Sequence, residues 1–260
     1  MSGGRNFDDL ITRFTQNIYA HPKGKIRLAI VQSDLEDNIP QLCQPGSLKV
    51  LDAGVGSGQM VRYFAQKGHA IVACDISKNM LCESERLVAE TVPSADVRFI
   101  HQAFQQLPHE MRGQFDLVIC HAVLEWVDEP IEAIESLLTY LRPGGRLSLM
   151  FYNVNAFILR NLLKGNFRKV QSGDYRGHPN GLTPNNPLDP ASILDALKAR
   201  QIQVDLYSGV RIVYDYLSAD MREQRSLEDI LDMEKRFSRR DPFRAMGRYV
   251  HLLCTSGTTT

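Results

Sequence analysis

Apolar residues occur along this chain in short runs that alternate with amphipathic stretches. Each run is rich in Val, Ile, Leu and Phe and predicts a buried strand, while the stretches between them have the composition and spacing of helices. Strands that alternate with helices predict an α/β fold with a doubly wound, mostly parallel sheet and helices on both faces. The strands are predicted at 48–53, 70–74, 97–101, 115–120 and 146–152, and the helices at 59–67, 78–91 and 129–141.

The chain on either side of this core is less regular. Residues 1–45 predict one or two N-terminal helices, and a helix predicted at 156–163 precedes a segment rich in Gly, Pro and Asn that includes HPNGLTPNNPLDP. Irregular segments of this length inside a compact domain are typically functional, with disorder as the alternative. The later elements are a helix at 190–199 capped by Asp189, strands at 204–207 and 209–215, a helix at 226–237 and a strand at 248–254.

These elements fit one domain. A chain of 260 residues, 43% of them hydrophobic, is long enough to bury a single large core. We divide it into an N-terminal helical cap (1–45), a ligand-binding core (46–153), an insertion or lid (154–190), C-terminal strands and helices (191–254) that complete a substrate-binding region, and a disordered tail (255–260).

Charge and cysteine content narrow the setting. The 30 basic and 30 acidic residues balance, so any polyanionic partner must be met by a local patch rather than by an overall field. The five cysteines are odd in number and form no C-x-x-C pair, which predicts reduced thiols and no metal site. The chain has neither a signal-like N-terminus nor an apolar run near the roughly 18 residues that cross a bilayer, which predicts a cytoplasmic protein without membrane contact.

The first strand runs into a glycine-rich turn in the sequence KVLDAGVGSG at 49–58. Glycines at this place let the backbone turn tightly and approach a ligand. The dinucleotide fingerprint G-x-G-x-x-G also brings a helix N-terminus against a pyrophosphate, whereas here Gly54, Gly56 and Gly58 alternate. The spacing favours a ligand whose amino-acid part lies over the turn and needs no phosphate there. A turn with a purely structural role is the alternative.

A second acid follows at the end of the next strand. Asp75 lies 21 residues beyond Gly54, close to the offset of about 20 residues at which an acid reaches a ribose hydroxyl pair. Ile76 and Met80 are apolar residues placed to cover an adenine face, although Met80 alone fits a core position equally well. The sequence therefore predicts a nucleoside ligand.

Together these motifs resemble those of the class I S-adenosylmethionine-dependent methyltransferases, which have a Rossmann-like fold. The resemblance covers about residues 46–153 and includes HQAFQQL (101–107), QFDLVICHAVLEWVDEP (114–130) and LRPGGRLSLMFYN (141–153). It implies that the glycine turn holds the methionine portion of S-adenosylmethionine, Asp75 the ribose, and Phe104 and Gln105 the adenine. His121 would lie beside the methionine portion and the sulfur. On its own, His121 also fits a hydrogen-bonded core position.

A narrower resemblance extends through almost the whole chain. The N-terminal RNFDDLITRFTQNIYAHPKGKIRLAIVQSDL, the block CHAVLEWVDEP, LMFYNVN with GNF, and the C-terminal VRIVYDYL and GRYVHL are together similar to the bacterial tRNA 5-carboxymethoxyuridine methyltransferases. Those enzymes convert the carboxylate of a modified wobble uridine into its methyl ester. The turn GVGSG departs from the family's GGGEG at Val55 and Ser57. Carried over residue by residue, the resemblance implies a cofactor site made of Arg27, Gly54, Val55, Gly56, Asp75, Ile76, Phe104, Gln105 and His121.

The implied chemistry needs few catalytic groups. A carboxylate with a pKa of about 4 is already ionised at neutral pH, so its attack on a sulfonium methyl needs no general base. Positioning then dominates, and a guanidinium or hydroxyl is expected to hold the acceptor's second oxygen. A packed aromatic or a surface charge is the alternative for each candidate, and Arg27 is also a candidate for the cofactor's carboxylate. The candidates are Arg27, Tyr152, Arg211, Tyr214 and Arg248.

Two basic stretches with interleaved aromatics are candidates for contact with a tRNA anticodon loop. Basic side chains neutralise phosphates and aromatic rings stack on unpaired bases, although most charge runs are simply solvated faces. The first, at 160–176, contains Arg160, Lys164, Arg168, Lys169 and Arg176 with Phe167 and Tyr175. The second, at 235–250, contains Lys235, Arg236, Arg239, Arg240, Arg244 and Arg248 with Phe237, Phe243 and Tyr249, against one acid, Asp241.

Three functions remain open from the sequence. The first is the tRNA carboxylate methyltransferase. The second is a methyltransferase for a small acid or quinone-like metabolite, which would use the same core without RNA. The third is a catalytically silent module that binds S-adenosylmethionine. The sequence does not give the oligomeric state, the tRNA species, or whether 164–189 is ordered without tRNA.

Overall fold

The computed structural model describes residues 21–176, 184 and 186–256. The predictions for 1–20, for most of the HPNGLTPNNP stretch and for the end of the tail lie outside the described residues.

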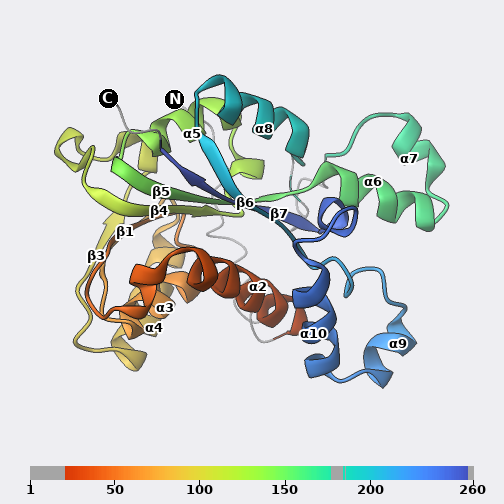
Figure 1. The fold of residues 1–260 in the computed structure, drawn as a ribbon, viewed down its shortest axis with the longest axis horizontal. Helices are drawn as coiled ribbons and strands as arrows, with labels where there is room; N and C mark the ends of the chain where they lie inside the picture. The colour runs from red at the N-terminus through yellow and green to blue at the C-terminus, as the bar shows by residue number, and fades with distance from the viewer. Residues whose placement is uncertain (1–20, 177–183, 185, 257–260) are drawn as a thin grey trace.

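A seven-stranded sheet forms the centre of the molecule (Figure 1). Its order is β3-β2-β1-β4-β5-β7-β6, in which the first five strands are parallel and β7 is antiparallel to both of its neighbours. The predicted fold class is confirmed. The strands are β1 (Lys49–Ala53), β2 (Ala70–Asp75), β3 (Val97–His101), β4 (Phe115–His121), β5 (Leu141–Tyr152), β6 (Gln203–Val210) and β7 (Tyr249–Thr255).

Helices cover both faces of the sheet. In Figure 1, α5 and α8 lie on one face, α2, α3, α4 and α10 on the other, and α6 and α7 project from one end. The α-helices are α2 (Pro22–Asn38), α3 (Gln59–Gln66), α4 (Lys78–Thr91), α5 (Pro130–Leu138), α6 (Val154–Leu163), α7 (Phe167–Gln171), α8 (Pro190–Ala199), α9 (Ala219–Gln224) and α10 (Leu227–Phe237).

The two faces bury separate cores, and this explains why the central strands read as nearly continuous apolar runs. Leu51 and Val118 pack with α5 and α8 on one side, while Val50 and Ile119 pack with α2 and α3 on the other. A strand buried on both faces needs apolar residues at every position. The apolar runs in the sequence therefore identified the strands. The polar residues at the strand ends belong to the site instead.

Helix starts follow side-chain caps that the sequence displays. Asp189 accepts a hydrogen bond from the N–H of Ala191 at 3.1 Å with Pro190 in the first turn, so α8 begins where it was predicted. Ser77 likewise caps α4, because its hydroxyl accepts from the N–H of Met80 at 3.2 Å.

The predicted strand at 209–215 is wrong. β6 ends at Val210, Arg211 has φ 62°, and the chain turns away from the sheet. Beyond it, the N–H groups of three successive residues, 212–214, donate to the carboxylate of Glu234 at 2.7, 3.0 and 2.8 Å. A carboxylate on α10, distant in the sequence, therefore replaces the strand partner that these N–H groups would otherwise need.

The ends of the predicted helix at 129–141 and of the predicted strand at 146–152 also differ from the structure. α5 ends at Leu138, not 141, and β5 is extended from Leu141 with a register shift opposite 115–117. Two short helices, α7 and α9, were not predicted, because pieces this short carry no clear periodicity. None of the helices within the described ranges is long and apolar enough to cross a membrane.

Candidate active site

A cavity of about 760 Å³ opens at the carboxyl ends of β1, β2 and β4. This is where the strand order reverses between β1 and β4, the usual ligand position in open α/β sheets. The volume is within the range of small-molecule sites. All nine residues that the sequence predicts at the cofactor line it: Arg27, Gly54, Val55, Gly56, Asp75, Ile76, Phe104, Gln105 and His121.

The glycine turn uses its backbone N–H groups inside the protein. The N–H groups of Gly54 and Val55 donate to the carbonyl of Cys74 at 2.8 and 3.1 Å, and the N–H of Gly56 donates to Asp75 Oδ2 at 2.9 Å. A diphosphate-binding turn presents such groups to its ligand. The alternating glycines therefore form a turn that is ill-suited to a diphosphate, as their spacing predicts.

Close packing explains two of the three glycines. A Cβ at Gly54 would stand 2.3 Å from Val123 Cγ2, and a Cβ at Gly58 would stand 2.3 Å from Ser84 Oγ; their φ values of 89° and 81° are also strained for other residues. A Cβ at Gly56 would meet no atom within 4 Å. Because Gly56 lines the cavity, its missing side chain leaves space for a ligand.

Asp75 is held at the end of β2 in a fixed orientation. Its Oδ2 accepts from Gly56 and its Oδ1 accepts from the N–H of Ser77 at 2.8 Å. A carboxylate accepts hydrogen bonds at both of its oxygens. The arrangement is suited to accepting hydrogen bonds from a pair of ribose hydroxyls.

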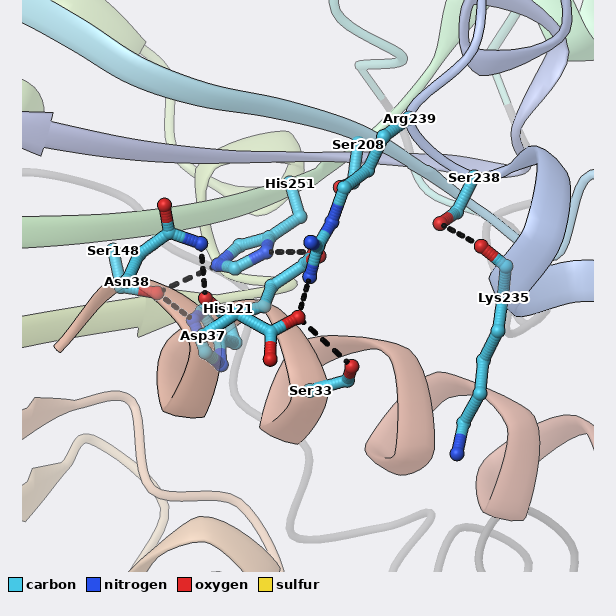
Figure 2. A network of polar contacts seen from close by, with 11 residues as sticks. Ser33, Asp37, Asn38, His121, Ser148, Ser208, Lys235, Ser238, Arg239 and His251 are labelled. Carbon is cyan, nitrogen blue, oxygen red and sulfur yellow. Dashed lines mark hydrogen bonds and ion pairs between the residues drawn. The ribbon is translucent and has the colours of Figure 1, made fainter. Parts of the chain in front are cut away.

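His121, at the end of β4, begins a row of hydrogen-bonded buried side chains that runs across neighbouring strands on one face of the sheet (Figure 2). Its Nε2 lies 2.8 Å from Ser148 Oγ, which lies 2.8 Å from His251 Nε2, and His251 Nδ1 lies 2.8 Å from Asp34 Oδ2. Arg239 Nε donates to Asp34 Oδ1 at 2.8 Å. Burial, with His251 and Arg27 nearby, holds the pKa of His121 well below its usual value, so its ring is neutral at physiological pH.

Two buried carboxyl groups also line the cavity. Burial and the neighbouring Asp75 raise the pKa of Asp52 to about 8. Burial raises the pKa of Glu125 to about 7, against opposing contributions from nearby backbone N–H groups and Arg27. Neither oxygen of Glu125 has a well-formed hydrogen bond among the described residues. Sequence analysis missed Glu125, because an acid after a strand in LEWVDEP reads as an ordinary loop residue.

The four further acceptor candidates do not line the cavity. Three of them gather around Tyr249, which does line the cavity. The ring of Tyr152 lies 5.5 Å from the ring of Tyr249, and the guanidinium of Arg211 lies 5.8 Å from the Tyr249 ring. The guanidinium of Arg248 lies 4.6 Å from the ring of Tyr152. Arg27 Cζ lies 5.4 Å from the centroid of the Tyr249 ring. Tyr249 therefore joins the cavity to a second group of polar residues.

The fourth candidate, Tyr214, is placed differently. Its N–H donates to Glu234, its ring lies 4.9 Å from the guanidinium of Arg222, and its carbonyl accepts from the same arginine at 3.0 Å. These contacts give Tyr214 a structural role in the segment after β6. The structure does not bring it to the Tyr249 junction.

Two donors in this second group are buried without an acceptor among the described residues: the hydroxyl of Tyr152 and the Nε–H of Arg211. Burial raises the pKa of Tyr152 to about 12, so its hydroxyl keeps its proton. A buried donor without a partner costs about 1–3 kcal/mol. The orphaned donors therefore indicate a place for an acceptor that the described residues do not supply.

The surroundings of these donors are rich in cations. The pKa of Lys23 is lowered by burial and by three arginines, Arg211, Arg222 and Arg160, against one carboxylate, Asp215. Asp215 already forms an ion pair with Arg211. Lys23 was not among the predicted residues, because its sequence context, HPKGK, gives no sign that it folds against residues near 211.

The two basic stretches are partly engaged within the protein. In the second, Arg239 pairs with Asp34 and Asp37, and Arg244 pairs with Asp241. In the first, Arg176 pairs with Asp174, and Lys169 lies 5.4 Å from the ring of Phe157. The first stretch also contains exposed apolar side chains on α6 and α7, Leu163 and Phe167, which are 68% and 57% exposed.

Comparison with known proteins adds to this geometry. The family described as "Methyltransferase domain" matches residues 51–149. The tRNA 5-carboxymethoxyuridine methyltransferase of Escherichia coli (strain K12) is 38% identical over 248 residues, which is 95% of either chain. This chain belongs to the tRNA 5-carboxymethoxyuridine methyltransferase family. The resemblance that the sequence predicts is confirmed.

Other matches extend over less of the chain or share only the fold. The ubiquinone biosynthesis O-methyltransferase of Xanthomonas axonopodis pv. citri (strain 306) is 30% identical but covers 51% of this chain and 52% of its own. The crystal structure of magnesium protoporphyrin IX methyltransferase from Synechocystis PCC 6803 with bound SAH superposes with a TM-score of 0.62 at 19% identity, covering 96% of both chains. The match to the tRNA enzyme, by contrast, covers 95% of this chain and so extends beyond the methyltransferase core.

Proposed function

We propose that this protein is an S-adenosylmethionine-dependent methyltransferase that converts the carboxylate of 5-carboxymethoxyuridine, at the wobble position of tRNA, into its methyl ester. The match over 95% of the chain to an enzyme named for that nucleoside supports the substrate. The observation that carries the acceptor site is the pair of orphaned donors, Tyr152 and Arg211, in a cation-rich group that adjoins the cavity. The tRNA substrate places the enzyme in the cytoplasm.

The cavity fits the cofactor. Asp75 is oriented to accept from the ribose, Gly56 leaves space over the turn, and Phe104 and Gln105 line the same cavity for the adenine. The carbonyl of Phe104 accepts from the Tyr140 hydroxyl at 2.6 Å, which anchors that loop to the core. Arg27 is the residue for the carboxylate of the methionine portion.

The reaction asks this chain mainly to position its substrates. S-adenosylmethionine supplies an electrophilic methyl group on a sulfonium. The acceptor carboxylate is already a nucleophile at neutral pH, so no side chain has to remove a proton. Binding that places the carboxylate oxygen close to the methyl group lowers the activation free energy by several kcal/mol, because the entropy of bringing the two reactants together has already been lost on binding.

Tyr152 and Arg211 hold the acceptor's carboxylate. Each has a buried hydrogen-bond donor in need of an acceptor, and Tyr152 remains protonated because its pKa is about 12. Arg248, stacked on the Tyr152 ring, adds positive charge on the same side. A carboxylate bound here would satisfy both donors, and charge-assisted bonds of this kind are the stronger ones.

The tRNA backbone contacts the α6–α7 hairpin. Lys164 and Arg168 are exposed there beside Leu163 and Phe167, a combination of cations and apolar surface that suits phosphates and unpaired bases. Arg160 lies between this surface and Tyr152, since its positive charge lowers the pKa of Tyr152 against the larger effect of burial. Of the second stretch, the exposed Lys235, Arg236 and Arg240 are the remaining candidates, because none of them forms an ion pair among the contacts described.

Nucleoside mass spectrometry tests the proposal. The purified protein is incubated with S-adenosylmethionine and tRNA from a strain that lacks this methyl ester, and the digested nucleosides are analysed. We expect the ester to appear, to disappear after mild alkaline hydrolysis, and to be absent when tRNA is digested before the incubation. Methylation of small acids or quinone-like phenols, with no product on tRNA, would contradict the proposal.

A further inference from the structure

The hydrogen-bonded side chains that run from His121 to Asp34 interrupt a layer that is otherwise apolar. His121, Ser148 and His251 lie on three neighbouring strands, β4, β5 and β7, and on the face that otherwise buries Ile119 and Leu253. Polar groups at such positions cost free energy unless every one is hydrogen-bonded. Each member here has a partner, so the direction of each hydrogen bond can be followed from Asp34 at one end to His121 at the other once the charge of His251 is fixed.

The arrangement begins at Asp34. Its Oδ1 accepts from the Ser208 hydroxyl at 3.0 Å and from Arg239 at 2.8 Å. A carboxylate beside a guanidinium can only accept hydrogen bonds. His251, completely buried, must therefore donate from Nδ1 to Asp34 Oδ2.

The remaining protons follow from His251. Arg239 contacts both Asp34 and Asp37, but the Asp37 side chain is 54% exposed and screened by water, whereas that of Asp34 is buried. With the guanidinium opposite the buried carboxylate, a neutral His251 avoids burying a further charge. Its Nε2 then accepts the one proton of Ser148, so Ser148 Oγ must accept from Nε2–H of His121. A neutral His121 with its proton on Nε2 has a lone pair on Nδ1, the ring nitrogen that does not contact Ser148, and the residue lines the cavity.

We propose that Asp34, His251 and Ser148 are positioning residues that fix His121 as the Nε2–H tautomer. The Nδ1 lone pair of His121 then accepts a hydrogen bond from the ammonium group in the methionine portion of S-adenosylmethionine. This inference rests on the proposed function for the identity of the donor, but the tautomer itself is a property of the free protein. The opposite tautomer would direct an N–H toward a cation. The hydrogen-bonded side chains thus decide whether His121 presents a lone pair or an N–H to the ligand.

The first test reads the tautomer directly. In protein labelled with ¹⁵N-histidine and free of cofactor, two-bond ¹H–¹⁵N correlations distinguish the nitrogen that carries the proton, and His121→Gln identifies the signal. We expect His121 to be protonated at Nε2 alone. An Nδ1–H ring, or an even mixture of tautomers, would overturn the inference while leaving the methyltransferase function untouched.

The second test reverses the chain with one isosteric change. In Asp34→Asn, the amide oxygen stays with the donors Ser208 and Arg239, so the amide NH₂ faces His251 and every proton downstream moves. We expect the His121 signal to change to Nδ1–H and the affinity for S-adenosylmethionine to fall about tenfold or more, as expected for a lost bond to a charged group. Asp37→Asn is the matched control, because Asp37 contacts the same arginine at 2.7 Å without joining the chain.

Each outcome decides. A reversed tautomer with unchanged affinity would contradict the role at the cofactor, and lower affinity in Asp37→Asn as well would assign the effect to Arg239. If Asp34→Asn does not fold, Ser148→Ala cuts the chain one residue from His121. It should give a mixture of tautomers and weaker binding, whereas a single Nε2–H tautomer would overturn the inference. Failure of the wild type to bind S-adenosylmethionine would instead count against the proposed function.

Discussion

The two halves of the site are built in different ways. The cofactor half lies at the ends of neighbouring parallel strands, where Gly54, Gly56 and Asp75 are fixed by backbone hydrogen bonds between consecutive elements. The acceptor half is assembled around Tyr249 from residues far apart in the chain, such as Lys23 and Arg211. The first half is held mainly by hydrogen bonds within the protein, with Glu125 as the exception among the described residues, whereas the second keeps two buried donors without an acceptor there. Substitutions should therefore separate the two halves.

The largest effect should follow from Gly58→Ala in the cofactor half. The new Cβ would stand 2.3 Å from Ser84 Oγ and 2.9 Å from Ser84 Cα at a φ of 81°, so both the turn and α4 must shift. We expect a loss of about 3 kcal/mol or more in the free energy of unfolding, measured with urea, and no detectable cofactor binding.

Gly56→Ala is the matched control for that change. Its Cβ meets nothing within 4 Å, so we expect a loss of only about 1–2 kcal/mol from its positive φ, with weaker cofactor binding because the methyl group enters the cavity. Equal destabilisation by the two substitutions would contradict the distinction between packing at Gly58 and ligand space at Gly56.

In the acceptor half, Tyr152→Phe removes one orphaned donor and little else. We expect kcat/KM for tRNA to fall about 10- to 100-fold, because a bond to a charged acceptor is lost, while the affinity for S-adenosylmethionine and the free energy of unfolding stay the same or rise slightly. Steady-state kinetics, calorimetry and urea unfolding check the three parts.

Tyr63→Phe provides the comparison, since its hydroxyl contacts Glu36 at 2.9 Å outside both halves. It should leave kcat/KM unchanged. Lower stability of Tyr152→Phe with normal kinetics would mean that the Tyr152 hydroxyl has a structural partner instead.

The pH dependence of cofactor affinity tests the cofactor half alone. Asp52, with a pKa of about 8, is mostly protonated in the free protein at pH 7, and a cationic ligand favours its ionised form. Binding therefore releases a proton below pH 8, and Kd should fall with rising pH, by at most about tenfold per pH unit, then level off. Calorimetry in buffers of different ionisation enthalpy measures the proton release. Glu125, with a pKa of about 7, lines the same cavity and adds to the pH dependence, so Asp52→Asn should lower the slope rather than remove it. Proton uptake in the wild type would contradict this account.

The smallest effect is expected on the outer surface. Replacing Lys164 and Arg168 by Ala removes two exposed cations of the α6–α7 hairpin. The affinity for tRNA should fall several-fold, and the slope of log K against log salt should decrease by about 1–2. Arg86→Ala is the control, because Arg86 is exposed on α4 and pairs only with Glu83 and Glu90 among the contacts described. An equal loss in both variants would indicate nonspecific attraction.

The difference between the halves also explains what could be predicted from the sequence. Strands buried on both faces, a glycine turn and an acid about 20 residues later are local signals, and they pointed to Gly54, Gly56 and Asp75, which line the cavity. Contacts between distant residues leave no such spacing. Nothing near 212–214 indicates that Glu234 will bind three of its N–H groups, so the segment read as a strand.

The buried chain left a weaker signal that was overlooked. Ser148 and His251 are polar residues inside strands that are otherwise apolar, in LSLMFY and YVHLLC. A polar residue at a position expected to be buried predicts a hydrogen-bonded partner. That pattern identifies candidates but not their pairing, because the partner Asp34 lies on α2, more than 200 residues from His251 in the sequence.

The central claim is that the acceptor half recognises a carboxylate. Its most direct measurement is the binding of two anticodon stem-loops in the presence of S-adenosylhomocysteine, one with 5-carboxymethoxyuridine and one with 5-methoxyuridine, which lacks only the carboxylate-bearing part. We predict that the carboxylate-bearing stem-loop binds about tenfold tighter or more, and that Tyr152→Phe reduces this difference. Equal dissociation constants for the two stem-loops would contradict the claim.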